Sequence, residues 1–230
     1  MLNKKFHAII LARGNSKEIK NKNIISLINK PLIAWTINHC KKSRHINKIW
    51  VSSDSLKIIK ISKKYGANCI LRPKSISGDN STSEEGWLHV INQLKKNYKI
   101  KNAIVLQATS PIRSSKDLDR AIEKFLKMKY DSLFSSVEVE NYFNWIKNKR
   151  ILKPLFNKNK RLMRQKIKSQ LQENGSFYIF NVNKFLKYKN RLFGKVGTYK
   201  MKKYQSFQID NKEDLLIVKS ILKNINKFSN

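Results

Sequence analysis

The sequence has few cysteines and lacks any long apolar run. Its 230 residues include two cysteines, Cys40 and Cys69, which form neither a CxxC pair nor the spacing of a disulfide framework. We therefore expect free thiols and a cytoplasmic protein. No apolar stretch approaches the roughly 20 residues that a transmembrane helix needs. The apolar run at residues 7–12 is too short for a signal peptide and leads directly into a loop, so it predicts a first strand.

Acidic residues are also scarce. There are 15 Asp and Glu residues against 49 Lys and Arg residues, which gives a net charge of +34. So basic a balance is typical of proteins that bind nucleic acid or anionic surfaces. The excess here is mostly lysine, occurs with many asparagines and isoleucines, and is spread along the whole chain. That pattern favours a drift in composition towards AT-rich codons, so we expect neither a nucleic-acid nor a membrane partner.

Short apolar runs alternate with amphipathic stretches along the first part of the chain. This alternation is typical of strand–helix units, and it predicts an α/β fold with a doubly wound, mainly parallel, Rossmann-like sheet. The runs expected to form strands are residues 7–12, 48–53, 68–71, 103–107 and 132–137. Two further strands are expected at residues 176–182 and around 207–209, before a last helix at about residues 212–224.

The predicted helices have recognisable first residues, because short polar side chains and proline are favoured there. The residues expected to begin them are Pro31, Asp54 or Ser55, Ser81 with Glu84 as a capping box, and Ser115. Asp54 stands at a strand end, where a metal ligand is the alternative interpretation. We expect it to cap a helix instead.

The segment 138–172 breaks this alternation. It has no clean period and carries many cations, which indicates an excursion from the sheet that serves as an arm or a subunit contact. Trp145, within it, is a candidate for such a contact. A chain of this length with 40% apolar residues can bury one substantial core, so we expect residues 1–230 to form a single domain.

The loop after the first strand is the first candidate for a binding site. Ligands of doubly wound sheets bind outside the carboxyl ends of the strands. Residues 12–23 supply a flexible Gly14, backbone donors and several cations, a combination that suits a triphosphate. The loop matches neither GxGxxG nor a Walker A motif. Taken alone, it could equally be a solvated turn in a lysine-rich protein.

Several short motifs together carry a more specific signal. In chain order they read ARGNSK with KNI, KPLIAWTI, IWVSSDS, RP with SGDNSTS, QATSPIR, YDSLFSSV, RQ, ENGSFYI and QID. This series resembles the N-acylneuraminate cytidylyltransferases, and the likeness covers roughly residues 6 to 222. The resemblance implies a nucleotidyltransferase that activates an acidic nine-carbon sugar, sialic acid or a related nonulosonic acid, with CTP. It also implies Mg²⁺ as cofactor and a homodimer whose arm matches residues 138–172.

The resemblance assigns roles to individual residues. Those implied to act in catalysis are Arg13, Lys17, Lys22 and Asp210, the last as the Mg²⁺ ligand. Those implied to bind substrate are Asn23 in the nucleotide loop, Arg72 and Ser83 at the cytidine, Gln107 and Tyr178 at the sugar, and Arg164 at the sugar or triphosphate. In the implied reaction the anomeric hydroxyl attacks the α-phosphorus and pyrophosphate leaves, so positioning and charge neutralisation dominate.

Two residues depart from the family pattern. Gln208 stands where the family commonly has the first of two aspartates, and Glu18 stands where it has a glycine beside the phosphates. An amide binds Mg²⁺ more weakly than a carboxylate does. The alternative function is therefore a weakened or inactive homologue that binds nucleotides or polyanions.

Overall fold

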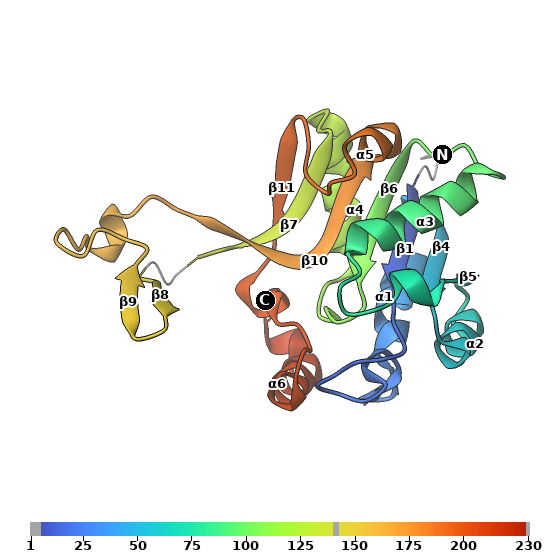
Figure 1. Cartoon of the computed structure of the whole chain (residues 1–230), viewed down its shortest axis with the longest axis horizontal. Coiled ribbons are helices and arrows are strands. Elements are labelled where there is room, and N and C mark those ends of the chain that lie inside the picture. Colours follow the sequence, from blue (N-terminus) through green and yellow to red (C-terminus); the bar gives the residue numbers. More distant parts are fainter. Residues whose placement is uncertain (1–5, 140–142, 229–230) are drawn as a thin grey trace.

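The computed structural model of the chain describes residues 6–139 and 143–228, and its centre is a seven-stranded sheet (Figure 1). Its strands are β1 (Phe6–Leu11), β4 (Ile46–Ser53), β5 (Asn68–Leu71), β6 (Asn102–Gln107), β7 (Ser132–Glu138), β10 (Leu171–Asn181) and β11 (Val196–Lys200). They lie in the order β11-β7-β10-β6-β1-β4-β5. Only β10 runs antiparallel to its neighbours in this sheet. The predicted mainly parallel, Rossmann-like α/β fold is confirmed.

Helices cover both faces of the sheet. They are α1 (Leu32–Lys42), α2 (Leu56–Lys64), α3 (Ser83–Lys95), α4 (Ser115–Lys127) and α5 (Val182–Tyr188). The last helix, α6 (Lys212–Lys223), packs instead in a separate cluster with Leu32 and Ile209. Successive side chains of β1 point to opposite faces, as the two-residue period of a strand requires. Ala8 and Ile10 pack with residues of α1, α2 and α4, whereas Ile9 packs with residues of α3 and α5. The central strands are apolar on both faces because both faces are covered.

Three helix starts show how the caps are formed. The hydroxyls of Ser55, Thr82 and Ser114 each accept a backbone N–H three residues further on, and the last two belong to capping boxes. The predicted caps at Ser81 and Ser115 were wrong by one residue. Adjacent hydroxyl and acidic residues make two registers equally compatible with the sequence, and only the tertiary position of the helix selects one.

The C-terminal region differs most from the prediction. Residues 207–209 form no strand; the Ile209 N–H donates to the Thr109 carbonyl at 2.9 Å, and the Ile209 side chain is buried against α6. The edge strand is instead β11, which contains Gly197 and few apolar residues and so carries a weak strand signal. The short helix α5 was also missed.

After β7 the chain leaves the sheet. The strands β8 (Trp145–Asn148) and β9 (Ile151–Pro154) pair as an antiparallel hairpin, which stands clear of the main body (Figure 1). The chain returns through the first residues of β10, which pair with the end of β7. A second small ladder joins β2 (Ser26–Leu27) to β3 (Lys30–Pro31), directly before α1. Among the described residues, no helix has the length and apolar character needed to cross a membrane.

Candidate active site

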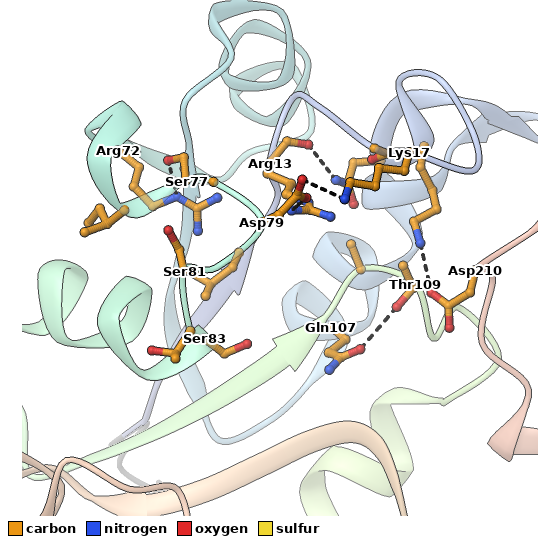
Figure 2. A pocket seen from close by; sticks show the side chains of 18 of the residues that line it. Arg13, Lys17, Arg72, Ser77, Asp79, Ser81, Ser83, Gln107, Thr109 and Asp210 are labelled. Carbon is orange, nitrogen blue, oxygen red and sulfur yellow. Dashed lines mark hydrogen bonds and ion pairs between the residues drawn. The ribbon is translucent and has the colours of Figure 1, made fainter. Parts of the chain in front are cut away.

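A cavity of about 560 Å³ opens at the carboxyl ends of β1 and β6 (Figure 2). Strand order switches at β1, because the chain continues to β4 on one side of it and to β6 on the other. Such a switch point is where doubly wound sheets bind their ligands. The cavity is lined by residues from the loop after β1, from the loop before α3, from the end of β6 and from the segment before α6.

One wall of the cavity carries a cluster of opposite charges. The Arg13 Nη1 lies 2.7 Å from Asp79 Oδ1, and the Lys17 Nζ lies 2.9 Å from Asp79 Oδ2. Figure 2 shows the Asp79 carboxylate between the two cations. Hydrogen bonds from Lys17 and Arg13 lower the pKa of Asp79, so it is ionised at neutral pH. This carboxylate therefore occupies cations that an anionic ligand could use.

The shape of the loop after β1 is fixed by two side chains. The Asp54 Oδ1 accepts the Gly14 backbone N–H at 2.8 Å, and the Asn23 Nδ2 donates to the Arg13 carbonyl at 3.0 Å. A Cβ on Gly14 would lie only 3.0 Å from the Ser55 Cβ, so any other residue would have to push Ser55 aside, and glycine avoids this. The prediction that Asp54 caps a helix was wrong: the cap is Ser55, and Asp54 holds the loop.

A second ion pair crosses the cavity floor. The Lys22 Nζ lies 2.9 Å from Asp210 Oδ1, linking the 3₁₀ turn Lys22–Ile24 to the segment before α6. Gln208, two residues earlier, has its amide engaged elsewhere: its Nε2 donates to the Asn174 carbonyl, and its Oε1 accepts the Thr109 hydroxyl at 3.5 Å. It is not among the lining residues, whereas Glu18 is.

Arg72 and Gln107 border the remaining sides. Arg72 is buried, and its Nε donates to the Ser77 hydroxyl at 3.0 Å. Burial lowers the pKa of its guanidinium, an effect that nearby Asp54 opposes and Arg13 increases. Gln107 is the last residue of β6, and its Oε1 accepts the Thr109 hydroxyl at 3.3 Å. Both side chains offer further polar atoms to a ligand.

Most of the residues that the sequence singles out lie around this one cavity. Those that line it are Arg13, Lys17, Lys22, Asn23, Arg72, Ser83, Gln107 and Asp210. Tyr178 does not line it; the side chain is buried, its hydroxyl donates to Glu173 at 2.9 Å, and burial raises its pKa. Its ring packs against Trp87, which does line the cavity. The Arg164 side chain lies outside the described part of the structure.

Sequence reasoning missed Asp79, although it is the only acid in the loop of residues 72–82. A lone carboxylate in a polar loop of so basic a chain was the available signal. Its partners Arg13 and Lys17 stand more than 60 residues away in the sequence, and only the fold brings them together. Thr109 and Trp87 were missed as lining residues for the same reason.

Comparison with known proteins identifies the family of the chain. A family model described as cytidylyltransferase matches residues 7–229. N-acylneuraminate cytidylyltransferase A of Danio rerio is 36% identical over 209 residues, which cover 88% of this chain and 47% of the relative. Pseudaminic acid cytidylyltransferase of Campylobacter jejuni is 37% identical over 134 residues, which cover 57% of this chain and 58% of the relative. The chain thus spans about half the length of these curated relatives.

The fold has solved counterparts as well. A CMP:2-keto-3-deoxy-manno-octonic acid synthetase complexed with CTP superimposes with a TM-score of 0.72 at 13% identity, over 96% of this chain and 99% of the solved one. At that identity the match shows a shared fold. The family model, in contrast, rests on the sequence itself and extends over nearly all of it. This chain belongs to the cytidylyltransferase family.

Proposed function

We propose that the protein transfers the cytidylyl group of CTP to the anomeric hydroxyl of an acidic nine-carbon sugar and releases pyrophosphate. The observation that carries this proposal is that Arg13, Lys17 and Lys22 line one cavity at the switch point of the sheet, where the Asp210 carboxylate pairs with Lys22. The names of the relatives support the class of substrate, because both N-acylneuraminate and pseudaminic acid are nonulosonic acids.

In this proposal the cations bind the triphosphate. Arg13 and Lys17 exchange Asp79 for phosphate oxygens, and Lys22 reaches the same region from the cavity floor. Fixed positive charges stabilise the negative charge that develops on the α-phosphate and on the departing pyrophosphate. Arg72 would hold the cytidine part, with Ser83, the first residue of α3, beside it.

The sugar is proposed to bind on the Gln107 side of the cavity. Gln107 would hydrogen-bond the acylated sugar, and Tyr178 would shape the pocket through the Trp87 ring on which it packs. Arg164 is proposed to join them from the segment that leads back from the arm. A sialic-like acid is the first candidate substrate, and other nonulosonic acids differ from it in the substituents that these side chains meet.

Mg²⁺ is the proposed cofactor, and the donor set fits it. Mg²⁺ is typically held by one or two carboxylates together with phosphate oxygens and water. Asp210 supplies an exposed carboxylate at the cavity, and bound CTP would supply the phosphate oxygens. Among the described residues no group of three metal-binding side chains stands ready, so the nucleotide would complete the site. When bound, the ion would neutralise charge on the phosphates.

We further propose a homodimer formed through residues 138–172. The hairpin in this arm exposes large apolar side chains, among them Trp145, Ile151 and Leu152, which are 50%, 72% and 62% exposed. Large apolar side chains exposed on one small element are typical of an interaction surface. We place the reaction in the cytoplasm, since Cys40 and Cys69 are free thiols that suit a reducing compartment.

The test is a pyrophosphate-release assay with CTP, Mg²⁺ and a panel of nonulosonic acids that includes N-acetylneuraminate. Release that requires both CTP and one of the acids supports the proposal and names the sugar. Lys17→Met should abolish most of this release, whereas Lys20→Met, an exposed lysine of the same loop that does not line the cavity, should not. Folded protein that binds CTP without any release would refute transfer and favour a nucleotide-binding homologue.

A further inference from the structure

Arg113 is a buried cation that the proposed chemistry does not use. It lies between β6 and α4 and is 1% exposed. Its Nη1 donates to the Ser176 carbonyl at 2.6 Å and to the Ser176 hydroxyl at 2.9 Å, and its Nη2 donates to the Thr36 hydroxyl and to the Gln107 carbonyl, each at 2.5 Å. One guanidinium therefore joins α1, the end of β6 and β10.

These four hydrogen bonds all go to neutral acceptors, and the Arg113 Nε has no hydrogen-bond partner within the described residues. Burial lowers the pKa of Arg113 to about 10, so it keeps its charge at neutral pH. Of its titratable neighbours, His39 and Cys40 are neutral there, because burial lowers the pKa of His39 to about 3 and raises that of Cys40 to about 12. The Asp117 carboxylate acts on Arg113 through space and opposes the effect of burial on its pKa. A buried cation whose hydrogen bonds go to no carboxylate is costly, and an uncharged side chain could join these elements at a lower cost in free energy.

The partners of Arg113 show what its position controls. Gln107 lines the cavity, and Ser176 directly follows Gly175, which adopts a left-handed φ of +64°. A Cβ on Gly175 would lie 3.5 Å from the Gln107 Nε2 and 2.8 Å from the Gln208 Nε2, so β10 passes close beside both amides. The planar fork of an arginine holds such partners at fixed angles, as a flexible lysine cannot. Arg113 thus fixes the Gln107 backbone through its carbonyl, and the β10 backbone passes close beside the Gln107 side-chain amide.

We propose that Arg113 is a positioning residue for the acidic sugar, fixing the Gln107 carboxamide in the cavity and placing a positive charge behind the cavity floor. This proposal rests on the proposed function, because it assigns Gln107 to the sugar side. It separates the two substrates: Arg113 contacts none of Arg13, Lys17 or Arg72, the residues proposed to hold the nucleotide. The effect of losing it should therefore fall on the sugar.

The experiment compares Arg113→Gln and Arg113→Lys with a stability control, Phe125→Leu. Phe125 is buried in α4 against Phe6, the first residue of β1, at the opposite end of the sheet from the cavity. For each variant, kcat and KM are measured separately for CTP and for the sugar, together with the CTP Kd and the midpoint of thermal unfolding. Arg113→Gln is expected to lower kcat/KM for the sugar by roughly tenfold or more, with the CTP Kd unchanged within about twofold.

Arg113→Lys keeps the positive charge but lacks the planar guanidinium, so its kcat/KM for the sugar should lie between those of Arg113→Gln and the unmodified protein. Equal losses for CTP and sugar, matching those of Phe125→Leu at a similar loss of stability, would overturn the proposal. If Arg113→Gln does not fold, Thr36→Val and Ser176→Ala each remove one hydroxyl acceptor of the guanidinium, while the Ser176 carbonyl remains, and each should lower kcat/KM for the sugar. An unchanged kcat/KM for the sugar in both variants would overturn the proposal.

A readout without turnover separates this proposal from the proposed function. The side-chain amide resonances of Gln107 in a ¹⁵N-labelled protein should move in Arg113→Gln and stay in place in Phe125→Leu. Movement in a protein that transfers no cytidylyl group would leave the positioning role standing while the proposed function fails. Unmoved Gln107 resonances in folded Arg113→Gln would overturn the positioning role.

Discussion

The Asp79 carboxylate occupies the cations proposed to bind the triphosphate, and removing its charge should therefore tighten CTP binding. In Asp79→Asn the neutral amide no longer competes for Arg13 and Lys17, whose nitrogens lie 2.7 and 2.9 Å from its oxygens. All three side chains are well exposed, at 51%, 38% and 73%, so solvent screens the two ion pairs. Each exposed pair changes an equilibrium constant by a factor of roughly two to five.

The two pairs share one carboxylate, so their effects should not simply multiply. We expect the CTP Kd of Asp79→Asn to fall about fivefold at low salt and by less at high ionic strength. Isothermal titration with CTP in the absence of sugar measures this directly. Asp79→Glu, which keeps the charge, should not tighten binding.

Glu123→Gln is the matched control for net charge. Glu123 is similarly exposed, at 46%, and its carboxylate also meets two basic side chains, Arg44 and His45, each at 3.0 Å. It does not line the cavity. If Glu123→Gln lowers the CTP Kd as much as Asp79→Asn does, the tighter binding comes only from long-range attraction between CTP and the more positive protein. Unchanged or weaker CTP binding in Asp79→Asn would refute competition between Asp79 and CTP for the two cations. It would indicate instead that Asp79 holds the loop in the conformation that binds CTP.

Three further changes have defined outcomes. Lys22→Met should lower kcat by roughly 100-fold or more, because a fixed cation beside Asp210 is lost, and steady-state kinetics that show an unchanged kcat would exclude Lys22 from the reaction. Gly175→Ala should destabilise the fold by about 1–2 kcal/mol or more in urea unfolding, since its φ is +64° and the new Cβ meets Gln208; an unchanged midpoint would contradict this. The pKa of His39 is lowered to about 3 by burial, so the unfolded chain binds its proton first and stability falls as pH drops from about 6.5 towards 3. Between pH 7 and pH 4, the free energy of unfolding should therefore fall by about 3 kcal/mol less in His39→Leu than in the unmodified protein. An equal fall in both proteins, measured by urea unfolding at each pH, would disprove this.

The sequence predicts those strands that are buried on both faces, because each of them contains a run of apolar residues. Strands β1, β4 and β6 are apolar on both faces, so short β-branched runs mark them at once. Strand β11 pairs only with β7 at the edge of the sheet and needs no such run, which is why it was missed. The segment 207–209 was expected to be a strand, but its sequence alternates apolar and polar residues in a way that an extended loop shares.

The candidate site also contains residues that the sequence predicts and residues that it does not. The loop after β1 was predictable because strand ends in doubly wound sheets are binding positions and this loop carries several cations. Asp79 and Arg113 were not, because their importance lies in partners that are distant along the chain. The Arg113 hydrogen bonds reach 77 residues back to Thr36 and 63 residues forward to Ser176. No local pattern encodes such contacts.

The place of β10 in the sheet has a consequence for how the chain acquires its structure. It is inserted between β6 and β7, although both precede it in the sequence and the whole excursion of the arm separates it from β7. As the chain emerges from the ribosome, β1, β4, β5 and β6 can pair while β7 has no partner on either side. The sheet closes only when residues 171–181 enter the gap, and such non-local pairing is slow. Nascent chains paused before that point expose the edges of both β6 and β7, so folding in the cell should depend on late completion of the sheet and on protection of those edges until then.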